Sequence, residues 1–335
     1  MERFVVIGSG NRSIEMFIKP IISQYNDVAT IVAILDTNIK RAEYVKQSIP
    51  YDVKVYNDFD KMLKEVEVDT CIITTTDCYH EFYIKKSIKN GLKVICEKPV
   101  VMNEEQFRYL SSLEQEQQDK IIVTFNSRYM PINKAIKELL QEENMGKIYS
   151  GNYHYFLDKE HGAEYFRRWH RYKEKSGSLF IHKSVHHFDL LNWWLQDKPV
   201  EVLASGGLEV FGCDRKRHGY RCQSCIYHCE YELSDEKSLQ YKKLYYNAEG
   251  ADGYIRDKCV FDGDIDIYDT MNAYIRYSKG TMINYSLTLY SAYTGFQLIL
   301  NAEHGHIMLD FNQTKKSNSI VLYKHHGEMK KIEVE

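Results

Sequence analysis

The sequence has no long uninterrupted apolar stretch. A membrane-spanning helix needs about 18 or more apolar residues in a row, and no run approaches that length. The chain starts Met1-Glu-Arg-Phe4 and passes directly into a strand-like segment, without the hydrophobic region and small-residue cleavage site of a secretory signal. We therefore expect no membrane partner and a cytoplasmic location.

An excess of charge of one sign is also missing. Lys and Arg total 44 against 47 Asp and Glu, which gives a net charge of −3. A dedicated nucleic-acid-binding protein usually carries a basic surplus, so we expect no nucleic-acid partner. Proline is scarce at 5, whereas tyrosine is abundant at 27 and suits a polar cleft that stacks rings. The length of 335 residues predicts two domains. We expect them at residues 1–126 and 127–335.

A glycine-rich turn follows the first apolar segment, at residues 8–13. Residues 3–7 are typical of a buried strand, and a helical pattern begins directly after the turn. This order is the context of a dinucleotide-binding fingerprint, in which Gly8 would allow the tight turn and Gly10 would let the backbone approach a pyrophosphate. The amides that open the helix would face that anion. Ser13 stands where a third glycine is expected, so the fingerprint is incomplete.

An acidic residue ends the next strand-like segment, at residues 29–35. Asp36 lies roughly 23 residues after Ser13, close to the spacing of the acid that binds the adenosine ribose. A carboxylate accepts hydrogen bonds from the ribose hydroxyls and repels a 2′-phosphate, so we expect NAD, with NADP disfavoured. Arg41 follows closely and could soften that preference. The alternative is that Asp36 caps the next helix.

Strand and helix patterns then alternate. Strands are expected at residues 52–56, 70–74, 93–96 and 121–125, and helices at 59–66, 81–90 and 104–117. Alternation predicts a parallel sheet with helices on both faces, and ligands bind such a sheet beyond the carboxyl ends of its strands. Polar clusters follow three of these ends, at residues 74–80, 97–99 and 126–129.

Residues 180–195 read as one amphipathic helix whose apolar residues repeat at helical spacing. Lys183 and His187 are four residues apart and would share a face, whereas His186 would point elsewhere. A Lys and a His on one face could hold a substrate hydroxyl and move its proton. The alternative is a solvated lysine beside two ordinary helix histidines.

These motifs together resemble the Gfo/Idh/MocA family, named for glucose-fructose oxidoreductase, inositol dehydrogenase and a rhizopine-catabolism protein. The resemblance rests on Gly8-Ser-Gly10, Asp36, the segment from Thr76 to His80, Glu97-Lys98-Pro99, Asn126-x-Arg128 and Lys183-x-x-x-His187. It implies an α/β protein with an N-terminal Rossmann domain and a C-terminal α+β domain that carries a large open, mostly antiparallel sheet. It also implies a nicotinamide cofactor and a sugar, cyclitol or related polyol substrate.

The resemblance also implies roles for single residues. Lys98 would contact the reacting hydroxyl, and His187 would be the acid/base. Many members carry Asp four residues before that histidine, where this chain has Lys183, so the proton path differs in detail. The expected cofactor-binding residues are Gly8, Gly10, Asn11, Arg12, Ser13, Asp36, Thr75, Thr76, His80, Glu97, Lys98 and Asn126.

A dense group of donors and aromatic residues at 166–171 precedes the Lys183–His187 segment. Trp faces stack on sugar C–H groups, while Arg and His bind hydroxyls or acids. We expect a carbohydrate substrate to be bound by Arg128, Tyr129, Arg168, Trp169, His170, Lys183 and His186. The alternative is a surface loop with its Trp folded into the core.

The remaining patterns predict the second domain. A helix is expected at residues 133–142, and strands at 148–156, 200–208, 267–289 with a hairpin turn at 278–280, 298–309 and 320–323. One face of such a sheet is a candidate surface for a homodimer or homotetramer.

An insertion at about residues 212–260 carries most of the eight cysteines. Cysteines of a non-secreted chain stay reduced, and metal binding is then more common than disulfides. Four thiolates would suit one structural zinc ion, held by Cys222, Cys225, Cys229 and Cys259. The alternatives are an iron–sulfur cluster, a site in which His228 or Cys213 replaces one ligand, and unliganded cysteines.

The function expected from these observations is an NAD-dependent oxidoreductase that transfers a hydride between the cofactor and a secondary hydroxyl or ketone of a sugar, glycoside or cyclitol. Two alternatives stay open. One is a glycosidase-like enzyme that recycles a bound NAD, and the other is a sensor that binds dinucleotide without turnover.

Overall fold

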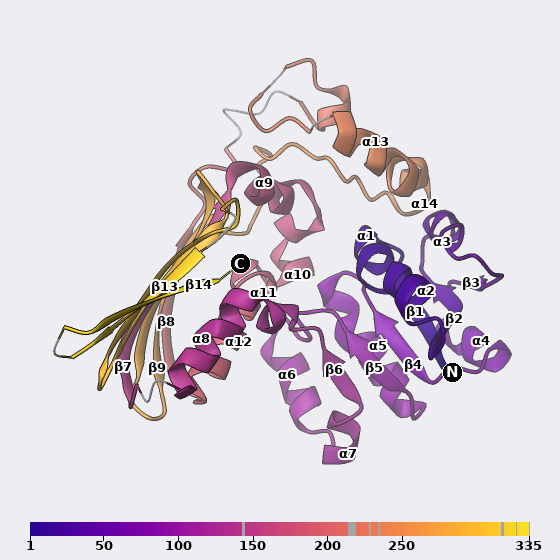
Figure 1. Cartoon of the computed structure of the whole chain (residues 1–335). Coiled ribbons are helices and arrows are strands. Elements are labelled where there is room, and N and C mark those ends of the chain that lie inside the picture. Colours follow the sequence, from indigo (N-terminus) through magenta and orange to yellow (C-terminus); the bar gives the residue numbers. More distant parts are fainter. Residues whose placement is uncertain are drawn as a thin grey trace. The chain divides into compact units, whose positions relative to one another are not determined.

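The computed structural model describes residues 1–142, 145–213, 219–227, 229–233, 235–315, 318–325 and 327–334 (Figure 1). The chain divides into two units. The first contains Met1–Thr124, Tyr172–Gly177 and Gly219–Lys258, and the second contains Phe125–Arg171, Ser178–His218 and Cys259–Glu335. The insertion, which we expected within the second domain, therefore groups mostly with the first unit.

The first unit is built on a parallel six-stranded sheet. Its strands are β1 (Glu2–Ile7), β2 (Ala29–Leu35), β3 (Lys54–Tyr56), β4 (Thr70–Ile73), β5 (Lys93–Cys96) and β6 (Ile121–Val123). They pair in parallel in the order β3-β2-β1-β4-β5-β6, which is the strand order of the Rossmann fold. The predicted parallel sheet is thus confirmed.

Helices cover both faces of this sheet. They are α1 (Asn11–Ser13), which runs through a π-helical turn (Ile14–Ile18) into α2 (Lys19–Gln24), then α3 (Ile39–Lys46), α4 (Phe59–Glu65), α5 (His80–Lys89), α6 (Glu104–Ser111) and α7 (Gln115–Gln118). Side chains of β1 alternate between two hydrophobic clusters, because successive residues of a strand face opposite sides. Val6 packs with the α1–α3 side, and Val5 and Ile7 pack with the α4–α5 side.

The insertion adds its own helices to the first of these clusters. It contains a short 3-10 turn (Cys222–Ser224), α13 (Asp235–Leu244), a second 3-10 turn (Tyr246–Ala248) and α14 (Glu249–Asp252). Tyr241 and Tyr245 are buried in the same cluster as Ile14 and Ile18. This part of the insertion therefore belongs to the hydrophobic core of the dinucleotide-type unit.

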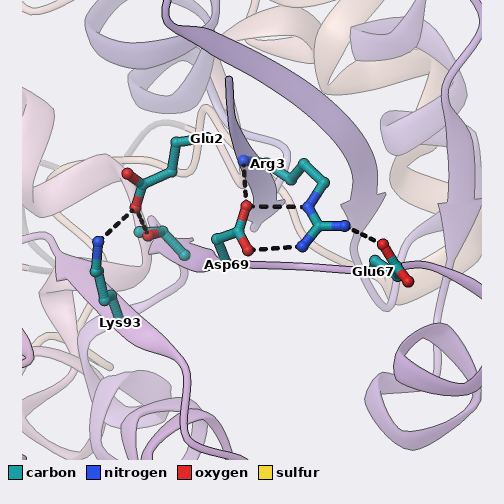
Figure 2. A network of polar contacts seen from close by, with 6 residues as sticks. Glu2, Arg3, Glu67, Asp69 and Lys93 are labelled. Atoms are coloured by element: carbon teal, nitrogen blue, oxygen red, sulfur yellow. Dashed lines mark hydrogen bonds and ion pairs between the residues drawn. The ribbon is translucent and has the colours of Figure 1, made fainter.

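A polar network joins the strands at their amino ends (Figure 2). The Asp69 carboxylate accepts from the Arg3 guanidinium at 2.8 and 3.0 Å and from the Arg3 backbone N–H at 2.9 Å. Arg3 also pairs with Glu67, and Lys93 donates to Glu2 at 3.2 Å. The hydrogen bonds from Arg3 hold the pKa of Asp69 well below its usual range.

The second unit is built on an eight-stranded sheet. Its strands are β7 (Ile148–Asp158), β8 (Pro199–Gly207), β9 (Thr270–Tyr277), β10 (Met282–Ser291), β11 (Gly295–Ala302), β12 (Gly305–Asn312), β13 (Asn318–Lys324) and β14 (Met329–Val334). The order is β14-β13-β12-β11-β7-β10-β9-β8, and every described pairing is antiparallel except that of β10 with β7. The expected open, mostly antiparallel sheet is confirmed.

Helices of the second unit lie against one face of this sheet (Figure 1). They are α8 (Pro131–Glu142), α9 (Lys159–Arg167), α11 (Leu179–His182) and α12 (Val185–Leu195), with 3-10 turns at Asn126–Tyr129 and Trp169–Arg171. The Tyr277 hydroxyl of β9 donates to Asn192 of α12 at 3.0 Å. On the opposite face, Met282, Met308 and Leu203 are exposed.

Within the described part of the chain, no helix has both the length and the apolar character needed to cross a membrane.

Candidate active site

The turn after β1 has a backbone conformation that requires glycine at position 8. Gly8 has φ +97°, and a Cβ there would lie 2.8 Å from backbone atoms of Thr74 and Thr75. The Thr74 hydroxyl donates to the Gly8 carbonyl at 2.8 Å. Only glycine suits this positive φ without a clash, so the tight turn predicted at Gly8 is present.

Asp36 connects this turn to the loop after β2. Its buried carboxylate accepts from the Ser9 backbone N–H at 2.6 Å and from the Asn38 backbone N–H at 2.7 Å. The cap of α3 is Asn38, whose side chain accepts from the Arg41 N–H, so the alternative role of Asp36 as a helix cap is wrong. Asp36 thus lies at the carboxyl ends of β1 and β2, as the ribose-binding acid must.

The side chains of Ser13 and Arg12 form further hydrogen bonds at this turn. The Ser13 hydroxyl donates to the Gly10 carbonyl at 2.7 Å, so the residue at the third-glycine position stabilises the turn by a side-chain bond. Arg12 Nε donates to Glu97 Oε1 at 2.6 Å. Glu97 is buried and precedes Lys98, so the turn and the Glu97-Lys98-Pro99 segment are directly linked.

His80 holds two neighbouring loops together. Its Nδ1 lies 2.7 Å from the Pro99 carbonyl oxygen and its Nε2 lies 3.2 Å from the Thr75 carbonyl oxygen. Burial lowers the pKa of His80, and the two carbonyls act in the opposite direction. Both ring nitrogens face a backbone carbonyl, of which a neutral imidazole donates to one, and we interpret His80 as support for the Thr75–Thr76 and Lys98–Pro99 loops. Lys98 itself is half-buried, and its peptide bond to Pro99 is cis.

These residues fit a dinucleotide. A Cβ built on Gly10 would have the Tyr245 hydroxyl as its nearest atom, at 3.7 Å, so a side chain of the insertion approaches the backbone at this point. The Ser9 hydroxyl is buried in this turn without a hydrogen-bond partner. Each carboxylate oxygen of Asp36 has a second lone pair that can accept from a ribose hydroxyl.

In the second unit, His187 begins a chain of hydrogen bonds with a fixed direction. Its Nδ1 lies 2.7 Å from the Tyr285 hydroxyl, which donates to Ser184 Oγ at 2.8 Å. Ser184 Oγ donates its one proton to the Leu179 carbonyl at 3.1 Å. Burial raises the pKa of Tyr285, so the phenol keeps its proton. Tyr285 must therefore accept from His187 Nδ1–H, and neutral His187 carries no proton on Nε2.

Lys183 and His187 meet at the ring of Tyr155. The imidazole stacks on this ring with centroids 4.0 Å apart, and Lys183 Nζ lies 5.0 Å from the ring centroid. The single helix predicted at residues 180–195 is wrong, because α11 ends at His182 and α12 begins at Val185. The backbone N–H groups of Lys183 and Ser184 both donate to the Leu179 carbonyl, and the Ser184 hydroxyl joins them, which interrupts the helical pattern.

Other residues expected to bind substrate or cofactor differ in their partners and in their exposure. Arg128 forms two hydrogen bonds with Asp189 of α12, at 2.7 and 2.6 Å, which raise the pKa of Arg128. Tyr129 and Asn126 are exposed in the same 3-10 turn. His186 is buried and packs edge-on against Phe125, with ring centroids 6.3 Å apart.

The donor and aromatic residues of the 166–171 segment divide into two groups. Trp169 and His170 stack on one another with centroids 3.6 Å apart, and His182 contacts both rings edge-on. Arg171 is fully buried, pairs with Asp264 at 2.7 Å and donates to the Cys259 carbonyl at 3.1 Å. Arg168 is partly buried, and its Nε has no hydrogen-bond partner. Arg171 is thus structural, His170 is buried in the stack, and Trp169 is only partly buried.

The predicted zinc site is not supported. Among the described residues, no group of three or more His, Cys, Asp or Glu side chains is gathered as a metal ion requires. The four proposed ligands, Cys222, Cys225, Cys229 and Cys259, form no disulfide bond. Cys222 instead packs against the hydrophobic core of the first unit, and Cys225 Sγ points to the Tyr227 carbonyl at 3.5 Å. The alternative ligand Cys213 joins no such group, and His228 lies outside the described residues.

Comparison with protein families decides the membership of the chain. Residues 2–125 match the profile of the oxidoreductase family with an NAD-binding Rossmann fold, and residues 137–332 match the profile of the C-terminal alpha/beta domain of that family. The chain belongs to the Gfo/Idh/MocA oxidoreductase family. The family and the fold suggested by the sequence motifs are thereby confirmed.

Individual relatives in the Gfo/Idh/MocA family differ in how much of the chain they match. YteT of Bacillus subtilis (strain 168), whose name calls it an oxidoreductase, is 33% identical over 92% of this chain and 76% of its own length. The inositol 2-dehydrogenase of Rhizobium meliloti (strain 1021) is 23% identical over 55% of this chain and 53% of its own length. Among solved structures, the WlbA dehydrogenase from Bordetella pertussis, in complex with NADH and UDP-GlcNAcA, aligns with TM-score 0.67 and 18% identity over 92% of this chain and 74% of its own. This last likeness shows the fold.

The sequence patterns did not predict several neighbours of the candidate site residues. Tyr155, Ser184 and Tyr285 surround His187, and Tyr245 of the insertion contacts the glycine-rich turn. Tyr155 and Tyr285 come from strands β7 and β10, and no local motif marks them. Ser184 had one signal, since a serine inside a helical pattern can bond its own backbone.

Proposed function

We propose that this chain is an NAD-dependent dehydrogenase or reductase that acts on a secondary hydroxyl or ketone of a sugar, glycoside or cyclitol. Membership of an NAD-binding oxidoreductase family supports the reaction class. The substrate class is supported by the names of relatives, which include an inositol 2-dehydrogenase and a dehydrogenase bound to a UDP-sugar.

The cofactor would be held by the first unit. The turn that contains Ser9, Gly10 and Asn11 would receive the pyrophosphate, and Asp36 would accept from the adenosine ribose. Bound NAD supplies the acceptor for the hydride that leaves the substrate carbon. Asp36 would repel the 2′-phosphate of NADP, which is the basis for preferring NAD. Arg41, the cation that could reverse this preference, is paired with Asp252 of the insertion.

Proton transfer is assigned to His187, and its bond to Tyr285 is the observation that carries the proposal. Because Nδ1 donates to Tyr285 Oη at 2.7 Å, Nε2 is the nitrogen that can accept a proton. Oxidation of an alcohol releases one proton from the hydroxyl, and Nε2 would take it. In the reverse direction His187 would return the proton to the alkoxide.

Two lysines would act on the substrate oxygen and its surroundings. Lys98 would polarise the reacting oxygen and stabilise negative charge on it during hydride transfer. Lys183, held over Tyr155 beside His187, would orient a substrate hydroxyl. Trp169 and Arg168 would contact the sugar, and the buried His170 would support the Trp169 ring on which it stacks.

We also propose a homodimer or homotetramer formed through the outer face of the second sheet. The exposed Met282, Met308 and Leu203 on that face support this proposal, because apolar side chains are favoured at such interfaces. A cytoplasmic location is proposed as well, because none of the eight cysteines forms a disulfide bond.

The direct experiment mixes purified protein and NAD with a panel of sugars, glycosides and cyclitols and follows reduced nicotinamide. The proposal expects catalytic appearance of reduced nicotinamide with at least one polyol. Stoichiometric dinucleotide binding without turnover on any member of a broad panel would instead indicate a sensor. Loss of a glycoside without net reduced nicotinamide would indicate a recycled cofactor.

A further inference from the structure

The insertion places a tyrosine on the glycine-rich turn. The Tyr245 hydroxyl accepts a hydrogen bond from the Asn11 backbone N–H at 3.0 Å. Tyr245 is buried, and its ring packs in the core cluster that also contains Ile14 and Ile18. Asn11 directly follows Gly10, so this contact lies on the backbone that the family uses to approach a pyrophosphate.

The insertion is also tied to the loop after β2. Asn38 Nδ2 donates to the Ala248 carbonyl at 3.0 Å, and Arg41 forms an ion pair with Asp252. The guanidinium of Arg41 lies 5.8 Å from the ring centroid of Tyr245. The segment from Tyr245 to Asp252 therefore contacts the loops that follow both β1 and β2. In a Rossmann sheet these loops bracket the adenosine and pyrophosphate end of the dinucleotide.

The hydrogen bond of Tyr245 uses a group that the dinucleotide needs. The Asn11 backbone N–H is partly buried, and its acceptor here is the phenol oxygen of Tyr245. A phosphate oxygen is a charged and stronger acceptor for the same N–H. One N–H cannot serve both acceptors with good geometry. The Tyr245 hydroxyl thus occupies the position at which Asn11 would donate to a phosphate.

We propose that Tyr245 stands in for a phosphate oxygen and competes with the dinucleotide for the Asn11 N–H. Dinucleotide binding displaces the hydroxyl, so the insertion sets how fast and how tightly the cofactor binds. This gives the insertion a function that needs no metal. The inference rests on the proposed function, because it assumes that NAD(H) is the cofactor.

The test compares wild type with Tyr245→Phe by the fluorescence of NADH on binding, at equilibrium and in stopped flow. Phenylalanine keeps the buried ring and removes only the competing oxygen. The expected result is a lower Kd for NADH and faster association, by roughly twofold to tenfold, the range of one hydrogen bond. Thermal unfolding of each variant checks that the fold is kept.

Tyr241→Phe is the matched control. Tyr241 lies one helical turn earlier, in α13, and is also buried, and its hydroxyl accepts from Arg256 at 3.1 Å. NADH binding by Tyr241→Phe should equal that of wild type. An unchanged or weakened affinity in Tyr245→Phe would overturn the competition while leaving the proposed function intact. Absence of NADH binding in all three proteins would overturn both.

Discussion

The imidazole Nδ1 of His187 and the hydroxyl of Tyr285 are 2.7 Å apart, and the groups behind Tyr285 decide which of them donates. Tyr285 gives its proton to Ser184 Oγ, and Ser184 gives its own to the Leu179 carbonyl. His187 must then donate from Nδ1. The backbone of α11 thereby selects the tautomer of a histidine on α12, with Nε2 ready to accept a proton.

Replacing Tyr285 by Phe should lower kcat by about tenfold, close to the effect of one lost hydrogen bond. Nδ1 loses its acceptor, so the ring is no longer held in one tautomer. KM should change little, because Tyr285 is not expected to contact substrate. Steady-state kinetics measures both constants. Tyr277→Phe is the control, since Tyr277 is equally buried but bonds to Asn192. An equal loss of kcat in both variants would show that the effect is structural.

Lys98→Ala should lower turnover by roughly a hundredfold, in line with the loss of a charged group at the reacting oxygen. NAD binding should survive, because the expected pyrophosphate and ribose contacts involve other residues. Calorimetric titration with NAD checks the binding and initial rates check the turnover. Lys93→Ala removes a largely exposed lysine of the same strand region and should leave both unchanged. Full turnover in Lys98→Ala would remove that residue from the mechanism.

Asp36→Ala should weaken NAD binding much more than NADP binding. The substitution removes the acceptor for the ribose hydroxyls and also the partner of the Ser9 and Asn38 N–H groups. The ratio of the two dissociation constants is the measurement, because any general damage to the loop affects both cofactors alike. If the affinities for NAD and NADP fell equally, Asp36 would only stabilise the loop and would not select the cofactor.

Asp252→Asn should improve NADP binding by roughly twofold to fivefold and leave NAD binding nearly unchanged. Arg41 is mostly buried and paired with Asp252, and a neutral partner frees its charge for a 2′-phosphate. Titration with both cofactors measures the change. No gain for NADP would mean that Arg41 does not reach the ribose.

Asp69→Asn should lower stability near neutral pH, and the difference from wild type should shrink in acid. The folded-state pKa of Asp69 is depressed by Arg3 from the ordinary value of 3.8. The stabilisation by the Asp69 carboxylate is complete above pH 3.8. It decreases as the pH falls from 3.8 towards the lower folded-state pKa. Urea unfolding of both proteins between neutral pH and pH 3 or so measures the difference. A gap that stays constant down to that pH would contradict the assignment.

The parts of the fold that depend on local pattern were predictable from the sequence. The glycine turn, the strand that ends at Asp36 and the alternation of strands and helices each need only nearby residues. The break before Val185 was missed because it depends on a serine hydroxyl that bonds the backbone in place of a helical turn. The close spacing of Cys222 and Cys225 suggested zinc, but spacing alone does not fold a loop so that thiols converge.

Contacts between distant segments account for the remaining differences. Tyr245 packs in the same hydrophobic cluster as Ile18 although the two residues are far apart in the chain, and no sequence motif links them. The partners of His187 likewise come from separate strands of the second sheet. Such pairs follow from the three-dimensional packing of the whole unit, which the local pattern of either segment does not reveal.

The central claim is that His187 accepts the substrate proton in an NAD-dependent oxidation, and one measurement tests it most directly. Initial rates of reduced nicotinamide formation are compared for wild type, His187→Ala and His186→Ala, with an active polyol from the panel. The account predicts a loss of roughly a hundredfold or more in His187→Ala, with NAD binding retained and a much smaller effect in His186→Ala. Near-normal turnover in His187→Ala would contradict it.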